Sequence, residues 1–257
     1  MLEAPPRATF AMPTARPQPP SPAERLRPRR DPAALAPAAA RSGAVVVGFV
    51  GGVGSGKSTV VDELAEILHA ERRDALIIDG DTVGHEVRDQ PEVVEQIVHR
   101  FGGEVRGPDG LIDRQALGLR VFGQGEQTDP DVLRQNLDAL NGIMHPAMRA
   151  EFESRVAATP AELVLFDAAI LLEAGWDDLC HEIVLVEVDA LTRQQRVAAR
   201  GWSPEQWQAR ENSQWPIDRK RAAATLAVLN QSPNATPEDA AAAVLDALDR
   251  VGSTATY

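Results

Sequence analysis

Lysine, cysteine and long apolar runs are scarce in this chain, and each scarcity limits what the protein can be. The single cysteine, Cys180, excludes an internal disulfide and fits a reducing compartment, so we expect a cytoplasmic protein. No run of 18 apolar residues occurs, so we expect no membrane span. Only Lys57 and Lys220 are lysines, so 24 of the 26 basic residues are arginine, a bias more typical of GC-rich coding than of a function.

Acidic residues outnumber basic ones, and the net charge is −12. A protein that binds nucleic acid broadly over its surface neutralises phosphates with basic side chains, so this balance argues against a nucleic-acid partner. It still allows a small phosphorylated ligand, because a local cluster of donors can outweigh the global sign. We therefore expect a small-molecule substrate rather than a nucleic-acid partner, and the sequence shows no sign of a membrane partner or of an obligate protein partner.

Residues 1–43 differ in composition from the rest of the chain. They hold ten of the 19 prolines, and their seven arginines against three acidic residues give +4, which leaves −16 for residues 44–257. Such a Pro-, Ala- and Arg-rich segment buries too little apolar area to offset chain entropy, so we expect a disordered extension. A transit peptide is the alternative, because the segment is arginine-rich and acid-poor, but its prolines prevent a continuous amphipathic helix.

Short apolar runs alternate with helical periodicity from residue 44 onward. Apolar runs without polar alternation are typical of strands that are buried on both faces of a parallel sheet. Strands separated by helices predict an α/β protein with a parallel five-stranded sheet flanked by helices. The expected strands are 44–50, 75–79, 162–167, 183–188 and, with a weaker pattern, 225–229.

The chain between about residues 82 and 159 shows helical stretches and no strand pattern. Insertions between core elements of an enzyme usually shape its substrate pocket, so we expect a helical substrate-binding insertion here. We expect one domain over 44–250, with a lid at about 196–222, followed by a C-terminal tail at 251–257.

The strongest motif follows the first predicted strand and opens a helix over about 58–69. It is Gly51-Gly52-Val53-Gly54-Ser55-Gly56-Lys57-Ser58, which matches the P-loop pattern and predicts a P-loop NTPase fold. Its glycines let successive N–H groups point at phosphates, and the helix adds its positive N-terminal end. We expect Lys57 to contact the β- and γ-phosphates and the Ser58 hydroxyl to bind Mg²⁺. The predicted ATP-binding residues are Gly52, Val53, Gly54, Ser55, Gly56, Lys57, Ser58 and Thr59.

Three aspartates lie at the ends of predicted strands, where ligands of parallel sheets bind. Asp79 and Asp81 are two residues apart, so on an extended chain both side chains can point the same way. One of them could accept the hydrogen bond of an attacking hydroxyl, and the alternative is that they cap the next helix. Asp167 ends the strand at 162–167, where it could hold Mg²⁺ through water or merely cap the segment that follows.

Two arginines, Arg196 and Arg200, lie four residues apart in a helix predicted from about Leu191, so we expect them to share a face. A pair of guanidinium groups suits closure over a triphosphate, and a solvated charged face is the alternative. Three tryptophans follow them, and we expect these to pack between helices rather than to stack on adenine. They are Trp202, Trp207 and Trp215.

With these elements in place, the sequence resembles the dephospho-coenzyme A kinase family over roughly residues 45–248. The P-loop is shared by many kinases, whereas the middle block and the His-Pro motif are more discriminating, and segment 167–176 is especially similar to the kinase domain of bifunctional coenzyme A synthases. The motifs, in the family's order, are GFVGGVGSGKST (48–59), IIDGDTVGHEV (77–87), FGGEVRGPDGLIDRQALGLRVFG (101–123), LNGIMHPAMR (140–149), LLEAGW (171–176) and the stretch from RVAARG (196–201) to Asn230.

The resemblance implies transfer of the γ-phosphate of ATP to the ribose 3′-hydroxyl of dephospho-coenzyme A, with ATP and Mg²⁺ as cofactors. That reaction is the last step of coenzyme A biosynthesis. The catalytic residues that the resemblance implies are Asp81 as base, Lys57 as phosphate ligand, and Arg196 or Arg200 as lid contact. The acceptor-binding candidates are Asp79, Asp81, Arg114, His145 and Arg149.

Other readings of the motifs remain. A P-loop kinase for another small molecule, such as a nucleoside, is one, and a nucleotide-operated switch is a second. The chain has no Asn-Lys-x-Asp motif for reading guanine, which favours ATP over GTP. An inactive homologue is a third reading, against which Lys57, Ser58 and Asp81 argue. No cysteine or carboxylate stands at ligand spacing from His145, so we expect no metal site there.

Overall fold

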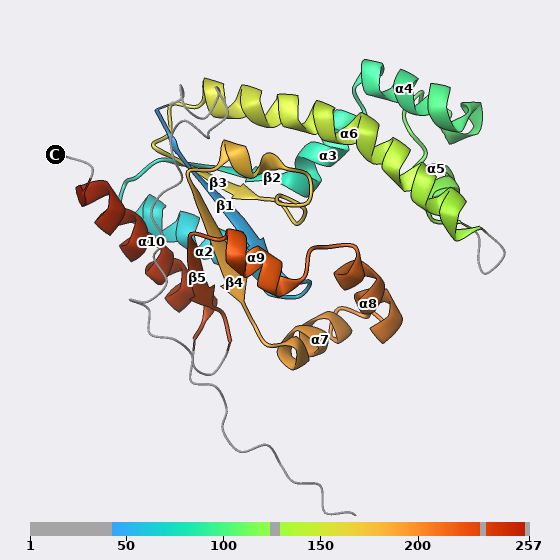
Figure 1. The fold of residues 1–257 in the computed structure, drawn as a ribbon. Helices are drawn as coiled ribbons and strands as arrows, with labels where there is room; N and C mark the ends of the chain where they lie inside the picture. Colours follow the sequence, from blue (N-terminus) through green and yellow to red (C-terminus); the bar gives the residue numbers. More distant parts are fainter. Residues whose placement is uncertain (1–42, 124–128, 232–234, 255–257) are drawn as a thin grey trace, which may run out of the picture.

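Five parallel strands form the central sheet, in the order β2-β3-β1-β4-β5 (Figure 1). Each strand begins and ends within one residue of its predicted range, and the predicted α/β fold is confirmed. The strands are β1 (Val45–Gly51), β2 (Ala75–Asp79), β3 (Leu163–Asp167), β4 (Glu182–Glu187) and β5 (Leu226–Leu229).

The structure is a computed structural model that describes residues 43–123, 129–231 and 235–254. The extension expected over 1–43 lies outside the described residues except for Gly43, and so do residues 255–257. Helix α10 (Pro237–Thr254) runs past the predicted domain end at residue 250, so residues 251–254 belong to a helix rather than to a tail.

Helices α2 (Lys57–Ala70) and α10 cover one face of the sheet (Figure 1). Alternate residues of β1 point to opposite faces, as strand geometry requires. Val47 and Phe49 pack on the α2 side with Leu64, whereas Val46 and Val50 belong to the core of the other face. Because both faces of β1 are buried, its sequence is apolar without alternation.

The long helix α6 (Pro130–Ala158) crosses the other face of the sheet. It contributes Phe152, whose ring lies 4.5 Å from that of Phe166 in β3 and 4.9 Å from that of Trp176 (centroid to centroid). Trp176 begins the short 3-10 helix η4 (Trp176–Leu179). All three rings are buried, so they fix α6 against the sheet.

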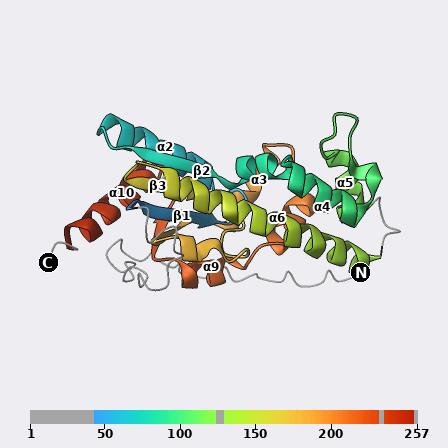
Figure 2. The ribbon, with the colours of Figure 1, turned by 90° about the horizontal axis from the view of Figure 1, so that it is seen from above.

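The segment between β2 and β3 is helical, as expected for the insertion at about 82–159. Apart from one isolated bridge between Arg106 and Ile112, its described residues form no strand. In Figure 2, α6 runs along the molecule with the shorter helices of this segment beside it. These are α3 (Gly80–Arg88), α4 (Pro91–Phe101), η3 (Gly103–Val105) and α5 (Arg114–Phe122).

Three helices connect β4 to β5 and contain the predicted lid. They are α7 (Ala190–Ala198), α8 (Pro204–Asn212) and α9 (Ile217–Ala223). Helix α7 ends at Ala198, so the prediction that Arg196 and Arg200 share one helical face is wrong. Gly201 adopts a left-handed backbone with φ of 83°, which ends the helix and places Arg200 in the turn.

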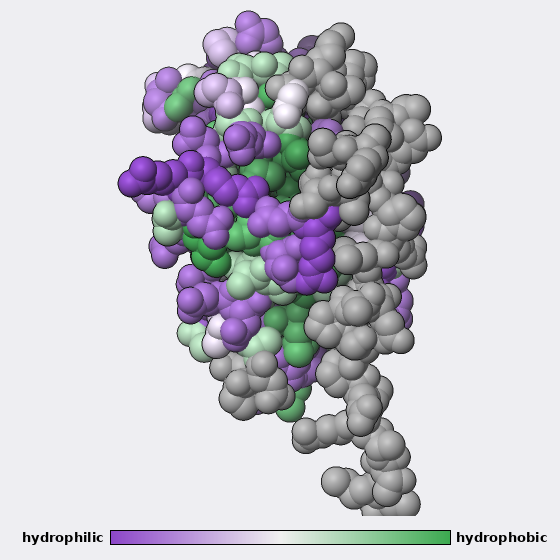
Figure 3. Space-filling view, turned by 90° about the vertical axis from the view of Figure 1, so that its left-hand side faces the viewer, coloured by the Kyte–Doolittle hydropathy of each residue, from purple (hydrophilic) through white to green (hydrophobic). Residues whose placement is uncertain are grey.

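Figure 3 shows one side of the molecule, the left-hand side of Figure 1, and its described surface is mostly hydrophilic with small hydrophobic areas. In the described ranges, none of the helices combines the length and the hydrophobicity that a membrane span requires.

Candidate active site

The P-loop connects the end of β1 to the start of α2 at the carboxyl edge of the sheet. Gly54 and Gly56 have φ of 86° and 77°, a left-handed backbone that side chains other than glycine rarely adopt. A Cβ atom on Gly56 would also lie 2.6 Å from Nδ2 of Asn230. The first turn of α2 contains no acidic residue, and Ser58 is exposed there. The helix N-terminus is therefore open to an anion.

The predicted carboxylates meet at the same edge of the sheet. Asp79 at the end of β2 is in register with Asp167 at the end of β3. Asp167 is only 4% exposed and forms an ion pair with the ammonium group of Lys57. Burial lowers the pKa of Lys57 from 10.5 to about 8, although the carboxylates of Asp81 and Asp79 act in the opposite direction. Lys57 thus lies within electrostatic reach of three carboxylates.

Asp79 and Asp81 differ in their contacts, and the sequence alone could not distinguish their roles. Asp79 caps helix α3, since its Oδ1 accepts a hydrogen bond of 2.6 Å from the N–H of Thr82. Asp81 lies in the first turn of α3 and is exposed. The chain is therefore not extended between the two, and that prediction is wrong. The Asp81 carboxylate has no hydrogen-bond or ion-pair partner among the described residues, so it can engage a substrate.

Arg196 contacts the P-loop at the backbone carbonyl of Ser55. Its Nη1 donates to the carbonyl of Ser55 at 3.0 Å, and its Nη2 donates to the carbonyl of Asn230 at 2.9 Å. Asn230 donates to the same Ser55 carbonyl at 2.9 Å. Arg200 is exposed and lies outside the helix. Of the two predicted lid arginines, the structure brings only Arg196 into contact with the P-loop.

A second arginine on α7, which the sequence reading missed, contacts the tip of the P-loop. Arg193 is 6% exposed, and its Nη1 forms an ion pair of 2.6 Å with Glu211 on α8. The other oxygen of Glu211 accepts from the N–H of Val53 at 3.1 Å. Trp207 packs beneath the guanidinium group and donates from its indole nitrogen to the Val53 carbonyl. Trp207 therefore contacts a side chain of α7 and the P-loop, and the expectation that it packs between helices rather than on adenine stays a prediction.

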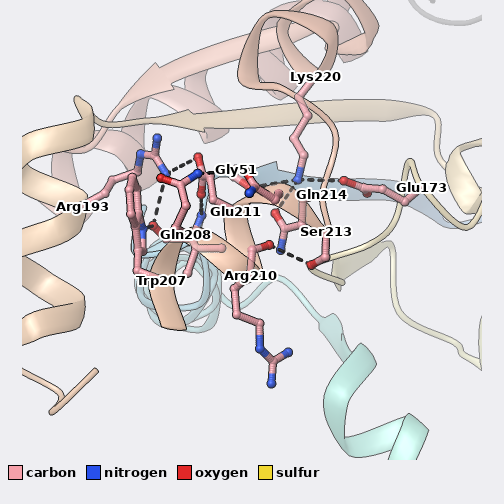
Figure 4. A network of polar contacts seen from close by, with 12 residues as sticks. Gly51, Glu173, Arg193, Trp207, Gln208, Arg210, Glu211, Ser213, Gln214 and Lys220 are labelled. Carbon is pink, nitrogen blue, oxygen red and sulfur yellow. Dashed lines mark hydrogen bonds and ion pairs between the residues drawn. The ribbon is translucent and has the colours of Figure 1, made fainter. Parts of the chain in front are cut away.

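Lys220, the other lysine, also reaches the P-loop (Figure 4). It is 1% exposed, and its ammonium group contacts the carbonyl of Gly51 at 3.1 Å, the side-chain oxygen of Gln214 at 2.8 Å and the carboxylate of Glu173 at 3.1 Å. Three acceptors match the three N–H bonds of an ammonium group. Both lysines of the chain therefore meet at the P-loop.

The candidate acceptor-binding residues on α5 and α6 differ in their contacts with the rest of the protein. Arg114, the first residue of α5, is exposed and donates to Nε2 of His85 on α3 at 2.9 Å. Arg149 is tied into the fold, because its guanidinium group forms two hydrogen bonds to Asp178, which raise its pKa, and a third to Glu153. His145 is half-buried, which lowers its pKa, and packs edge-on against Trp176.

The residues available to a metal ion are few. No group of three or more His, Cys, Asp or Glu side chains suited to a metal occurs in the part of the chain that the structure describes. Mg²⁺ in kinases is usually held by one or two protein oxygens together with substrate phosphates. The hydroxyl of Ser58 and the carboxylate of Asp167, which flank Lys57, fit such a donor set.

A P-loop at the carboxyl edge of a five-stranded parallel sheet, with carboxylates at neighbouring strand ends and helices over the loop, defines an ATP-dependent kinase of the P-loop NTPase fold. A family model described as "Dephospho-CoA kinase" matches residues 45–235. The chain belongs to the dephospho-CoA kinase family.

Curated relatives agree with this assignment. A dephospho-CoA kinase of Symbiobacterium thermophilum is 39% identical over 191 residues, which cover 72% of this chain and 74% of the relative. One of Geobacter sulfurreducens is 36% identical and covers 76% and 92%. Among solved structures, TT1252 from Thermus thermophilus aligns with a TM-score of 0.63 and 31% identity over 80% of this chain and 97% of its own. A dephospho-CoA kinase from Campylobacter jejuni, at 19% identity, 80% and 98% coverage and a TM-score of 0.55, supports the fold.

Proposed function

We propose that this protein transfers the γ-phosphate of ATP to the ribose 3′-hydroxyl of dephospho-CoA, giving CoA and ADP in the last step of CoA biosynthesis. Family membership supports the reaction, and the observation that carries its chemistry is the unengaged Asp81 carboxylate beside the P-loop lysine. A coupled assay with ATP, Mg²⁺ and dephospho-CoA tests the proposal. ADP formation that depends on dephospho-CoA supports it, and ADP formation only with a nucleoside acceptor contradicts it.

Asp81 is the proposed catalytic base. The 3′-hydroxyl is a weak nucleophile at neutral pH, so a carboxylate has to orient it and take its proton as the new P–O bond forms. Lys57 stabilises the charge on the transferring phosphate. Ser58 and Asp167 would hold Mg²⁺ together with the phosphates, and the ion would supply further charge neutralisation. The single cysteine, Cys180, is buried and has no second cysteine to form an internal disulfide with, which is in keeping with a proposed cytoplasmic location.

The lowered pKa of Lys57 predicts that kcat/KM for ATP falls at alkaline pH. Its pKa lies near 8 in the free protein, so the protonated, attractive form disappears as pH rises through 8. The value of kcat/KM for ATP, which reports groups of the free enzyme, should fall roughly tenfold from its plateau by about pH 9. A pH profile of initial rates measures this.

The matched variant for that profile is Lys57→Arg, because a guanidinium group stays charged over this range. Its kcat/KM, although lower overall, should show no alkaline fall near pH 8. A wild-type profile that stays flat to pH 10 would contradict the role given to Lys57.

The acceptor is proposed to bind between the P-loop edge and the insertion helices α3 to α6. Asp79 supports this pocket by capping α3, whereas Arg114 has exposed guanidinium donors suited to the acceptor's phosphates. Arg149 and His145 shape the pocket from α6 through their contacts with Asp178 and Trp176.

Substituting the two insertion arginines should separate binding from stability. Arg114→Gln should raise KM for dephospho-CoA roughly tenfold with little change in melting temperature, because it removes a charged donor from an exposed position. Arg149→Gln should instead lower Tm by roughly 2–4 °C, the effect of about 1 kcal/mol in a domain of this size, because it breaks the partly buried ion pairs of Arg149 with Glu153 and Asp178. Steady-state kinetics and calorimetry check both. An Arg114→Gln variant with unchanged KM rules out its acceptor role.

A further inference from the structure

One carboxylate joins the lid to the tip of the P-loop (Figure 4). Glu211 of α8 accepts from the backbone N–H of Val53 at 3.1 Å through one oxygen and from Nη1 of Arg193 at 2.6 Å through the other. The same Nη1 also lies 3.3 Å from the carbonyl of Val53. A Cβ atom on Gly52 would lie 2.7 Å from the guanidinium carbon, so the group rests directly on the loop.

The Glu211 carboxylate occupies a position suited to a phosphate group. P-loop N–H groups and arginine side chains are the two kinds of donor that proteins use for phosphates. Here one of each already converges on a single anion. A phosphate that replaced the carboxylate would meet both donors without any movement of the loop or of Arg193.

A second observation also indicates a missing ligand. The Nε of Arg193 is buried and has no hydrogen-bond partner among the described residues, so the side chain keeps one unused donor. A buried donor without a partner costs free energy that an incoming oxygen atom can recover. Trp207 holds the guanidinium group in place, with the guanidinium carbon 5.5 Å from the centre of its ring.

Lys220 provides the contrast on the other side of the loop. Its three N–H bonds are matched by Gly51, Gln214 and Glu173, so it has no donor left for a ligand. Lys220 is a fixed support of the P-loop, whereas Arg193 keeps one donor, its Nε, without a hydrogen-bond partner among the described residues. Figure 4 shows the two groups side by side, with Arg210 pointing away from both.

We propose that Arg193 is a further phosphate-binding residue for ATP, and that Glu211 is an internal anion which occupies this position until the nucleotide arrives. This inference rests on the proposed function, because the ligand of Arg193 is the ATP that donates the phosphate in that reaction. Binding of ATP then breaks the ion pair between Glu211 and Arg193 and displaces the Glu211 carboxylate from the N–H of Val53, while Trp207 of α8 keeps its contacts with Arg193 and the loop. The exchange lowers the apparent affinity for ATP, because part of its binding energy displaces the carboxylate.

Substitution of Glu211 tests the exchange directly. Glu211→Gln keeps the size of the side chain and removes its charge, so it should bind ATP about fivefold to tenfold more tightly than the wild type. Arg193→Gln should bind ATP roughly tenfold more weakly. Glu205→Gln removes a carboxylate from the same helix at a site with no P-loop contact in the structure, and its affinity should stay unchanged. Titration calorimetry with MgATP, without acceptor, measures all three.

Two results would overturn the proposal. If Glu211→Gln binds ATP no more tightly than the wild type and melts at a lower temperature, then Glu211 is only a static brace. If Arg193→Gln binds ATP as well as the wild type, then Arg193 does not contact the phosphates. If Glu211→Gln does not fold, as judged by circular dichroism, Glu211→Ala removes the same charge and should likewise bind ATP more tightly than the wild type.

The proposed function is tested separately, by phosphorylation of dephospho-CoA with wild-type protein. If the wild type fails to phosphorylate dephospho-CoA while Glu211→Gln still binds ATP more tightly, then dephospho-CoA is not the acceptor. The same result supports the exchange of Glu211 for a phosphate of ATP. Normal dephospho-CoA phosphorylation with equal ATP affinities in the wild type and in Glu211→Gln supports the function and overturns the exchange.

Discussion

Replacing Asp81 by asparagine should lower kcat by about 10²–10⁴ while leaving the affinity for ATP near that of the wild type. Asparagine keeps the size of the side chain and can still hydrogen-bond to the ribose hydroxyl, but it cannot take the proton. The exposed carboxylate has no partner among the described residues, so its loss should leave the fold unchanged. Steady-state kinetics with dephospho-CoA, together with ATP titration calorimetry, measure the two quantities.

Asp79→Asn is the matched control for this result. It removes a carboxylate two residues away, and asparagine is as good a helix cap as aspartate. The hydrogen bond to the N–H of Thr82 is therefore kept, and kcat should fall much less than in Asp81→Asn. If Asp79→Asn proves the more damaging change and Asp81→Asn is nearly silent, the two roles have to be exchanged. If neither matters, a base at this strand end is excluded.

The fold was predictable because its strands are buried on both faces. All five residues of β3 are buried, and such a strand has no polar position to interrupt the apolar run. The P-loop was predictable for a related reason: the left-handed backbone at Gly54 and Gly56 restricts those positions to glycine, so the motif is visible in the sequence. These features depend on local chemistry, which a single sequence contains.

The contacts of helices α7 and α8 with the P-loop were not predictable, because they join residues far apart in the chain. Glu211 and Val53 are 158 positions apart, and Arg193 and Val53 are 140 apart. No local spacing marks Arg193 among so many arginines. The same reading placed Arg200 on the helix of Arg196, since four-residue spacing suits a helix until Gly201 ends it.

One signal for the missed residues was present in the composition. Lysine occurs only twice in a chain whose other basic residues are arginine, and both lysines lie at the P-loop. A compact ammonium group with three donors fits the buried site between Gly51, Gln214 and Glu173, whereas a planar guanidinium group would not match its geometry. The rarity of lysine in the composition therefore singles out Lys220 as well as Lys57.

The other large effect is expected at Lys57. Lys57→Met removes the positive charge beside the transferring phosphate and should lower kcat by roughly 10²–10³, the usual effect of deleting one transition-state donor. Single-turnover rates at saturating ATP measure the loss. Near-wild-type rates in this variant would show that Lys57 does not stabilise the transferring phosphate.

Folding should tolerate the loss of Lys57. The sign of its contribution to stability follows from its pKa. The folded chain lowers that pKa from 10.5 to about 8, so the unfolded chain holds the proton more tightly and the charged side chain opposes folding at neutral pH. Its removal therefore relieves one cost, but it leaves Asp167 buried without its cation, which adds another. Adding Asp167→Asn to Lys57→Met removes the second cost, so the double variant should melt at a higher temperature than the single one without regaining the lost kcat. A double variant that melts lower than Lys57→Met would mean that the carboxylate of Asp167 stabilises the fold through contacts other than its ion pair with Lys57.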